Sequence, residues 1–339
     1  MFNGETGEKF FDMQGFNPLR VSRRKLRALL SDGINVQYGK KLSTITVSDG
    51  LATAKFSDDT SASATLIVGA EGVHSPTRSV LVGVDAALNQ STDVQMINTC
   101  WRLPAGIALA QRKAHPIFRI GYHPNNTQWV TAVQNIPDPN DPKSWLFQQA
   151  LSWAGAPRPD DFPDQKSKVD FVRKIADEYV EPWKSAGKNI PDDQEFGVDV
   201  ITMWKPEMDW TSSPLWPHVT LAGDAAHNMP PFRGQGLNQG FMDAEKLVSE
   251  LVVVKKGEKE WKDAIKAYEE EMKPRSIQEI EISAMQGKMS HDWKSMMGSP
   301  LMQQGMERYK QSVGGKVERA DEVGNAVEGG AGKEVNGLA

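Results

Sequence analysis

The segment VTLAGDAAHNMPPFRGQGLNQGFMDAEKLVSEL, residues 219–251, is the most informative part of the chain. A short apolar strand ends at Gly223-Asp224, and a double proline and a Gly-Gln-Gly turn lead into an amphipathic helix. In open α/β sheets, ligands contact residues just past the carboxyl ends of the strands, where Asp224 lies. A carboxylate there can accept hydrogen bonds from a sugar or polyol hydroxyl. The segment therefore predicts a ligand site in an α/β protein.

The residues after Asp224 favour a planar ligand. Pro230 and Pro231 fix the backbone and expose a flat apolar edge, beside which a ring can lie. Gly234 and Gly236 open a helix whose free N–H groups and positive end would face the ligand. Such an end stabilises negative charge that arises only during reaction. A planar ring that becomes anionic and carries a polyol describes a flavin with its ribityl arm.

A plain strand–turn–helix, with glycines for tight packing, is the alternative interpretation. It would be sufficient for Gly223-Asp224 alone, but it does not explain the whole pattern of residues 223–238. Two more segments have related features. Residues 64–81 read as a buried strand, a glycine-rich turn and a short helix, and the apolar run Leu66-Ile67-Val68 looks like a parallel strand covered on both faces. Residues 21–30 have apolar side chains at near-helical spacing after a predicted N-cap at Ser22.

Four quoted segments carry a family resemblance. GDAAHNMPPFRGQGLN resembles the second flavin-binding motif of the p-hydroxybenzoate hydroxylase-like family, the single-component FAD-dependent monooxygenases. GAEGVHSPTR, residues 69–78, is similar to that family's Gly-Ala-Asp-Gly…Ser…Arg turn, and RRKL matches its Arg-x-x-Leu helix start. YEEEMKPR with the helix after it looks like the C-terminal region. The resemblance spans about residues 20–295, and the chain looks most like the fungal salicylate-hydroxylase-like branch.

The resemblance implies a set of FAD-binding residues. Asp224 would hold the ribityl or pyrophosphate part of FAD, and residues 234–238 would face the isoalloxazine ring with their backbone. Glu71 and Arg78 would lie between FAD and the transient NADPH or NADH. The cofactor-binding residues implied are Arg23, Glu71, Arg78, Gly223, Asp224, Pro231, Gly234, Gln235, Gly236, Leu237 and Asn238.

Some residues within the motifs need separate comment. The guanidinium of Arg78 can grip two phosphate oxygens at once, whereas the alternative role is a surface ion pair. Glu71 replaces the family's aspartate, which keeps the charge but lengthens the reach by one methylene. His74 and His227 lie inside the motifs, but nothing in their spacing indicates a catalytic role.

One family element is not found in the sequence. The family begins with a strand–helix–strand unit bearing Gly-x-Gly-x-x-Gly, with an acidic residue about 20 positions later on the adenosine ribose. GQGLNQG at 234–240 is a near match, but it follows the proline corner and not a strand. We therefore expect the chain to start after that unit, as a truncated gene product, a fragment or a degenerate paralogue.

The expected fold is α/β, an incomplete FAD/NAD(P)-binding Rossmann-like domain with an inserted sheet-based substrate domain. Residues 1–82 and 214–312 would form the discontinuous FAD-binding domain without its N-terminal unit. Residues 83–213, which are richer in tryptophan and proline, would form the substrate domain. Residues 313–339 have little that could pack and are predicted to be a disordered tail.

Local patterns give further expectations. Residues 34–59 indicate three short strands, separated at Gly39-Lys40 and by a hairpin at Asp49-Gly50. Pro274 is expected to bend or break a helix. The helix after residue 238 places its apolar residues on one face: Phe241, Ala244, Leu247, Val248, Leu251 and Val252.

Composition excludes several classes of protein. The net charge of −5 over 339 residues offers no basic face for nucleic acid. The single cysteine, Cys100, excludes an internal disulfide framework and a cysteine-rich metal site. We find no uninterrupted apolar run near the length of about 18 residues that a membrane span needs, and no signal peptide pattern. The expected compartment is the cytoplasm.

The resemblance implies a monooxygenase. NADPH or NADH would reduce FAD, O2 would add to the flavin, and the hydroperoxide would hydroxylate an aromatic or similar small molecule. An alternative of another class is an inactive remnant of the flavoprotein fold with weak or no FAD binding. A flavin-dependent halogenase or reductase is a third possibility, but the paired-tryptophan motif of halogenases is not seen. The sequence indicates no catalytic side chain, metal site, particular substrate or oligomeric state.

Overall fold

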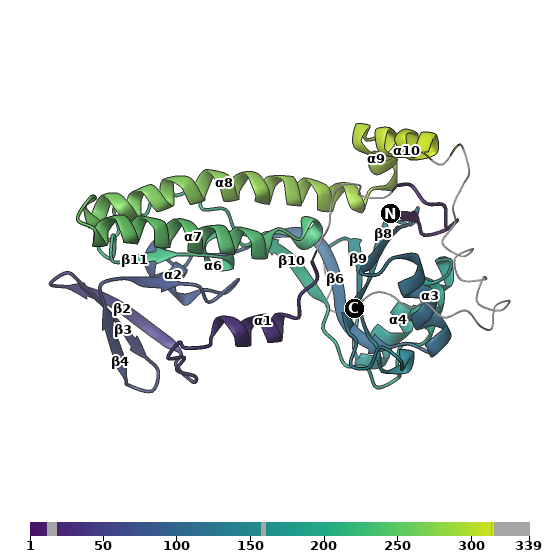
Figure 1. The fold of residues 1–339 in the computed structure, drawn as a ribbon, viewed down its shortest axis with the longest axis horizontal. Helices are drawn as coiled ribbons and strands as arrows, with labels where there is room; N and C mark the ends of the chain where they lie inside the picture. The colour runs from purple at the N-terminus through teal and green to yellow at the C-terminus, as the bar shows by residue number, and fades with distance from the viewer. Residues whose placement is uncertain (12–18, 157–160, 313, 315–339) are drawn as a thin grey trace. The chain divides into compact units, whose positions relative to one another are not determined.

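The computed structural model describes residues 1–11, 19–156, 161–312 and 314, and it divides into two compact units (Figure 1). Unit 1 comprises residues 1–32, 93–200 and the chain from 288 onward. Unit 2 comprises residues 33–92 and 201–287. Each unit is therefore built from segments that are not contiguous in the sequence, as expected for a discontinuous domain.

Unit 1 is built on a mixed six-stranded sheet with the strand order β1-β7-β8-β9-β6-β10. Neighbouring strands β6 to β9 pair antiparallel, whereas β1 pairs parallel with β7. The strands are β1 (Phe2–Asn3), β6 (Gln90–Arg102), β7 (Phe118–Tyr122), β8 (Thr127–Asn135), β9 (Leu146–Ala154) and β10 (Asp199–Met203). The first residues of β6 and the last residues of β10 belong to unit 2.

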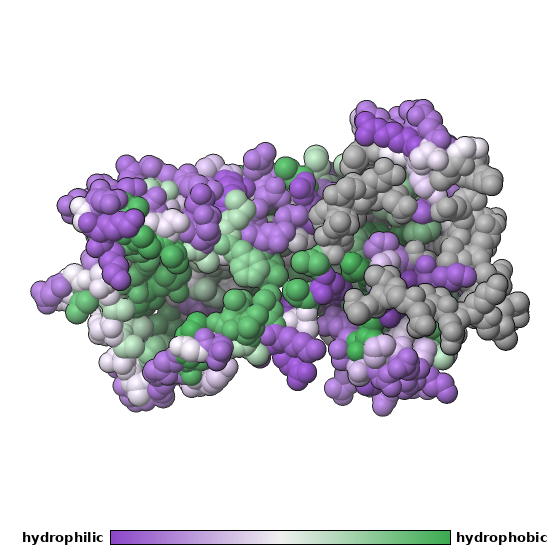
Figure 2. Space-filling view, in the orientation of Figure 1, coloured by the Kyte–Doolittle hydropathy of each residue, from purple (hydrophilic) through white to green (hydrophobic). Residues whose placement is uncertain are grey.

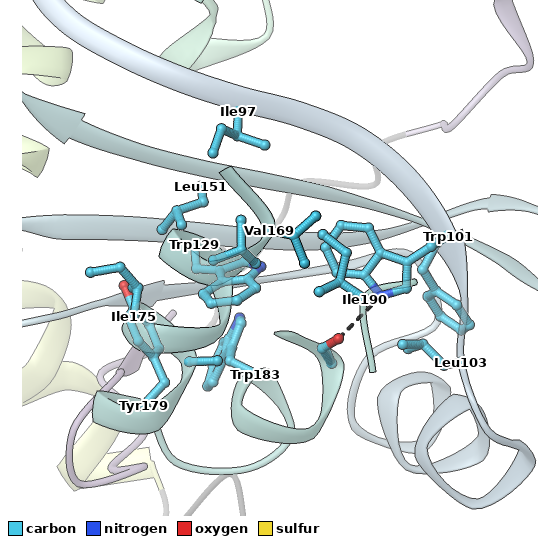
Figure 3. Packing of buried hydrophobic residues seen from close by; sticks show 14 of the residues in the cluster. Ile97, Trp101, Leu103, Trp129, Leu151, Val169, Ile175, Tyr179, Trp183 and Ile190 are labelled. Atoms are coloured by element: carbon cyan, nitrogen blue, oxygen red, sulfur yellow. Dashed lines mark hydrogen bonds between the residues drawn. The ribbon is translucent and has the colours of Figure 1, made fainter. Parts of the chain in front are cut away.

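Helices cover one face of this sheet (Figure 1). They are α3 (Ala105–Ala114), α4 (Gln165–Glu178) and α5 (Trp183–Lys188). Because side chains alternate along a strand, Trp129 of β8 and Leu151 of β9 point to the same face and pack with Val169 and Trp183 (Figure 3). The indole of Trp101 donates to the Ala186 carbonyl at 3.1 Å, so this large ring is buried without losing its hydrogen bond.

The rest of unit 1 consists of shorter elements. Helix α1 (Arg23–Leu30) starts at the predicted cap, because the Ser22 side chain accepts from the Lys25 amide, and it buries no residue. Phe10 and Tyr122 pack with methionines of α9 (Trp293–Met297) and α10 (Pro300–Ser312) in a second cluster. A single 3-10 turn, η1 (Pro142–Ser144), precedes β9.

Unit 2 contains the strand expected near residue 67. β5 (Ile67–Gly69) pairs parallel with β11 (Val219–Leu221), so the two motif-bearing strands lie side by side. Both are followed by a turn and a helix, α2 (Pro76–Val82) and α6 (Asp224–His227). The prediction of a doubly covered strand is wrong for these residues, because Val68 is 38% exposed on a sheet of two strands.

A three-stranded antiparallel sheet forms the edge of unit 2. Strands β2 (Leu42–Ser48) and β3 (Leu51–Phe56) join at Asp49 and Gly50, which both have positive φ, so the predicted hairpin is confirmed. The third strand is β4 (Ser61–Ala64), and residues 34–38 form no strand.

Two long helices, α7 (Gly236–Lys255) and α8 (Trp261–Ser290), run side by side (Figure 1). Pro274 does not break α8, because buried residues on both sides of it, Met272 and Ser276, keep the helix packed. The expected apolar face of α7 is only partly buried. Leu247 lies in the core, but Phe241 and Val248 are exposed.

The compact units divide the chain at other places than those expected from composition. Residues 83–92 and 201–213 fall in unit 2, whereas residues 1–32 and 288–312 fall in unit 1. The physical reason is packing that composition does not report: β1 joins the sheet of unit 1, and α9 and α10 contribute to its second core cluster. The predicted tail, 313–339, lies outside the described residues apart from Gly314. None of the helices in the described ranges is both long and apolar enough to cross a membrane.

Candidate functional site

The Gly223-Asp224 turn presents a carboxylate at the end of a strand. Gly223 has φ 60° and ψ −146°, a backbone region that essentially only glycine occupies. Its carbonyl accepts from the amides of Ala226 and His227 at 2.8 and 2.9 Å, which starts the short helix α6. Asp224, the first residue of α6, is exposed. The turn therefore places the acid where the sequence predicted it.

The open start of α7 lies beside this carboxylate. No described side chain caps the helix, and Gln235 instead accepts a hydrogen bond from the Asn238 side-chain amide at 3.0 Å. A Cβ built on Gly236 would lie 3.7 Å from Asp224 Oδ1, and one built on Gly240 would lie 3.8 Å from Gly223 Cα. These distances place the turn in van der Waals contact with the first turns of the helix, so a hydrogen-bond acceptor lies next to free N–H donors.

The proline corner presents one proline and buries the other. Pro231, the first residue of the 3-10 turn η2 (Pro231–Arg233), is exposed, whereas Pro230 is buried. The ring of Phe232 packs against Gly287 of α8, where a Cβ would come within 2.5 Å of Phe232 Cδ2. Helix α8 therefore supports the corner from behind and leaves the edge of Pro231 open.

Arg78 links the two motifs and is enclosed. Its guanidinium donates to the backbone carbonyls of Val73, Asp224 and Ala225 at 2.6, 3.4 and 3.2 Å, and it stacks on the ring of Trp204 at 4.7 Å. The side chain is 1% exposed, and burial lowers the pKa of the guanidinium. Neither expected role, the grip on a phosphate or a surface ion pair, agrees with this geometry. Arg78 instead holds the chain around Asp224 in place.

Glu71 supports the start of helix α2. Its carboxylate accepts from the Ser75 hydroxyl at 2.7 Å and from the Thr77 amide at 3.3 Å, as well as from the Thr77 hydroxyl. The longer glutamate side chain is what reaches Thr77, so the departure from aspartate has a local use. In this structure Glu71 pairs with the helix start and makes no hydrogen bond to Arg78.

Most of the expected residues lie in one compact unit. Gly223, Asp224, Pro231 and the 234–238 segment lie in unit 2, where Leu237 and Asn238 are exposed. Arg23 is an exposed residue in unit 1 at the start of α1. Among the described residues there is no group of three or more side chains arranged to hold a metal ion.

Sequence reasoning missed a buried network behind the turn. Asp243 of α7 is fully buried and accepts from the Gly223 amide at 2.7 Å, from His227 Nε2 at 2.6 Å and from Arg275 at 2.8 Å. His227 therefore has a structural role in the motif, because it hydrogen-bonds the buried carboxylate of Asp243. The sequence does contain one sign of this network. Asp243 is an acidic residue among the apolar residues of an amphipathic helix, where a buried acid needs hydrogen-bond donors.

Comparison with known proteins shows the family of this chain. Residues 198–283 match the model of an FAD binding domain. The FAD-dependent monooxygenase phnB of Penicillium herquei is 34% identical over 312 residues, which cover 90% of this chain and 75% of that protein. The FAD-dependent monooxygenase cctM of Talaromyces islandicus is 30% identical over 309 residues, covering 91% and 76%.

The chain belongs to the p-hydroxybenzoate hydroxylase-like family of FAD-dependent monooxygenases. It is accordingly an enzyme of this class, and it spans about three quarters of the length of these two relatives.

Solved structures support the family's fold. A variant of Klebsiella pneumoniae HpxO complexed with FAD has a TM-score of 0.70 at 18% identity, covering 96% of this chain and 79% of that one. A salicylate hydroxylase substrate complex has a TM-score of 0.65 at 15% identity, covering 96% and 80%. The prediction of an FAD-binding Rossmann-like fold with a substrate domain is confirmed by these likenesses.

Proposed function

We propose that this monooxygenase binds FAD through residues 223–238, consumes NADPH or NADH, and hydroxylates an aromatic or similar small molecule. The observation that carries the proposal is the exposed Asp224 carboxylate beside the uncapped start of α7. An acceptor for polyol hydroxyls and a cluster of free N–H donors are adjacent there, which matches the chemistry of a ribityl chain joined to a ring that gains negative charge.

The residues fit FAD in distinct ways. Asp224 would accept hydrogen bonds from the ribityl hydroxyls. The amides at the start of α7 would stabilise negative charge on the ring through the positive helix end. Pro231 would lie against the flat face or edge of the ring. When bound, FAD would accept hydride from the reduced nicotinamide and activate O2. The protein therefore needs no nucleophilic side chain.

A second candidate is a member of the family that, as this chain, binds FAD weakly or not at all. It is favoured by the apolar surface of unit 2, which gathers along α7 (Figure 2). Leu237, Phe241 and Val248 are 50%, 45% and 56% exposed, and the parallel sheet has two strands. In this candidate the adenosine and pyrophosphate half of FAD has no scaffold among the described residues, so flavin affinity would be low.

Oxidation of the reduced nicotinamide separates the two candidates. The purified chain is mixed with FAD, and NADPH or NADH oxidation is followed with a panel of phenols and aromatic carboxylates under air. The monooxygenase predicts oxidation that depends on FAD, is accelerated by one group of aromatics, and yields a product that carries one oxygen atom from O2. If FAD binds and no aromatic accelerates oxidation or gains oxygen, the hydroxylase assignment fails. If FAD does not bind, the second candidate is supported.

A further inference from the structure

We propose that Asp243, acting with His227, is the positioning residue of the flavin site, because it fixes the Gly223-Asp224 turn in the conformation that presents the Asp224 carboxylate. The proposal rests on the FAD-binding role of residues 223–238, and it assigns two side chains that would not touch the flavin. Their action would pass through the backbone of the turn.

All three hydrogen-bond partners of Asp243 are donors. Oδ2 accepts from the Gly223 amide and from His227 Nε2, and Oδ1 accepts from Arg275. Burial by itself favours the neutral acid, but the hydrogen bonds from His227, Arg275 and the Gly223 amide keep the pKa of Asp243 below its ordinary value. An ionised carboxylate can only accept, so it is matched to this set of partners. An amide in its place would have to direct an N–H at one of them.

The turn is held from both sides. On one side Asp243 fixes the Gly223 amide, and on the other Arg78 holds the carbonyls of Asp224 and Ala225. Between these points Gly223 has a backbone conformation that residues with a side chain rarely adopt. A conformation of this kind persists only where its surroundings fix it, and the two contacts do so immediately before and after the Asp224 side chain.

The carboxylate is itself anchored to a second helix. Arg275 of α8 binds Asp243, pairs with Glu271 on its own helix at 2.8 Å, and donates to the Gln239 side chain of α7. The network therefore connects α8, α7 and the turn. A shift of Asp243 would change the position of the turn relative to the helix start that faces the flavin.

Glu269 provides a matched control in the same unit. It is also buried on α8 and also accepts from three donors, the indoles of Trp210 and Trp216 and the hydroxyl of Thr220. None of these three hydrogen-bond partners lies within residues 222–238. Asp243→Asn and Glu269→Gln thus introduce the same chemical fault, a buried amide facing hydrogen-bond donors, at a position that holds the turn and at one that does not.

Four quantities are measured on the full chain and on both variants: the melting temperature, the hydrogen exchange of peptides covering residues 221–228, the FAD dissociation constant from flavin fluorescence, and the visible circular dichroism of the bound flavin. We expect both variants to melt earlier. Only Asp243→Asn should accelerate exchange in 221–228 and raise the FAD dissociation constant by about tenfold or more. The visible circular dichroism of the flavin at saturation should change in that variant alone, because the ring would sit differently.

A pair of variants at His227 extends the test if Asp243→Asn does not fold. His227→Gln keeps a side-chain donor and should stay within about threefold of the native affinity, whereas His227→Leu should lose about tenfold. Equal effects of Asp243→Asn and Glu269→Gln on exchange and on FAD affinity would overturn the proposal, as would native behaviour of both Asp243→Asn and His227→Leu. If the native chain binds no FAD, the proposed function fails, and the exchange rates alone decide whether Asp243 holds the turn.

Discussion

Gly223 carries the strictest backbone requirement of the site. Its φ of 60° and ψ of −146° lie where a side chain is strained, even though no atom lies within 4 Å of the position a Cβ would take. The requirement is therefore conformational and not steric. The φ and ψ angles of Gly223 set the direction of the chain at Asp224, so the position of the Asp224 carboxylate depends on them.

We expect Gly223→Ala to lower the free energy of unfolding by about 1–3 kcal/mol, because alanine must adopt the same strained angles. Urea denaturation measures the loss. Gly106→Ala in helix α3 is the control, since Gly106 has an ordinary φ and open space around it, and alanine is the better helix former there. A Gly223→Ala protein as stable as the native chain would show that the turn conformation is not required.

Arg78 shows how burial decides the role of a charged residue. Replacement by methionine keeps much of the volume but removes the side-chain donor to the carbonyls of Asp224 and Ala225, whereas the Val73 carbonyl keeps the Asn89 amide as a donor. We expect Arg78→Met to cost about 1–3 kcal/mol for each carbonyl left buried without a donor. Thermal unfolding is the measurement, with the exposed Arg24→Met as its comparison. Equal melting temperatures for the two variants would restore the alternative of a solvent-facing arginine.

Sequence patterns predicted which motifs contain Arg78 and Asp224, but they did not predict which groups the Arg78 side chain contacts. Spacing placed Arg78 and Asp224 in two motifs that turn out to touch, because both follow strands of one parallel pair. Whether a guanidinium faces a ligand or a carbonyl depends on burial, which the motif does not encode. Asp243 was missed for a related reason: an isolated acid on a helix has no partner in sequence, and its donors come from residues 16 to 32 positions away.

Helix α8 supports the site at the scale of elements. It contributes Arg275 to the Asp243 network, Gly287 to the packing of Phe232, and Glu279 to an ion pair with Arg233 at 3.6 Å. The helix can do this because it continues through Pro274, so that Arg275, Glu279 and Gly287 stand on one continuous helix. The sequence analysis predicted a bend or break in the helix from Pro274 alone. It could not take into account the tertiary packing of the residues on each side of this proline.

Gly287→Ala tests this support. The new methyl group would overlap the Phe232 ring, and overpacking of this kind costs about 1–3 kcal/mol. We further expect a weaker affinity for FAD, since Phe232 lies within the proline corner. Denaturation and flavin fluorescence measure the two effects. Met285→Ala, at an exposed position on the same helix, should change stability by less than about 0.5 kcal/mol. If Gly287→Ala matches that control, α8 does not position the corner.

At the scale of the whole molecule, the proposed site at residues 223–238 would hold the flavin half of FAD, and the described residues contain no Gly-x-Gly-x-x-Gly turn for the other half. Joining a relative's strand–helix–strand segment ahead of residue 1 should therefore tighten FAD binding. The added segment would bring a helix start for the pyrophosphate and could cover apolar surface on α7. Calorimetric titration of both proteins with FAD is the measurement. Equal affinity would show that the described residues already hold the whole cofactor.

The fold class was predictable because it depends on strand–turn–helix patterns repeated along the chain, whereas the domain boundaries were not. Composition changes near residues 83 and 213, but hydrogen bonding between strands decides which residues belong together. Phe2 pairs with Gly121 across more than a hundred residues, and no local pattern indicates that contact.

The most direct test of the central claim is an FAD titration of the protein carrying the added segment, compared with its Asp224→Ala variant by flavin fluorescence. Loss of a charge-assisted acceptor costs about 1.5–3 kcal/mol, so the variant should bind FAD about ten- to hundredfold more weakly. Glu245→Ala, which removes an exposed carboxylate from α7 outside the motif, should bind like the parent protein. An unchanged affinity in Asp224→Ala would contradict the assignment of residues 223–238 as the flavin site.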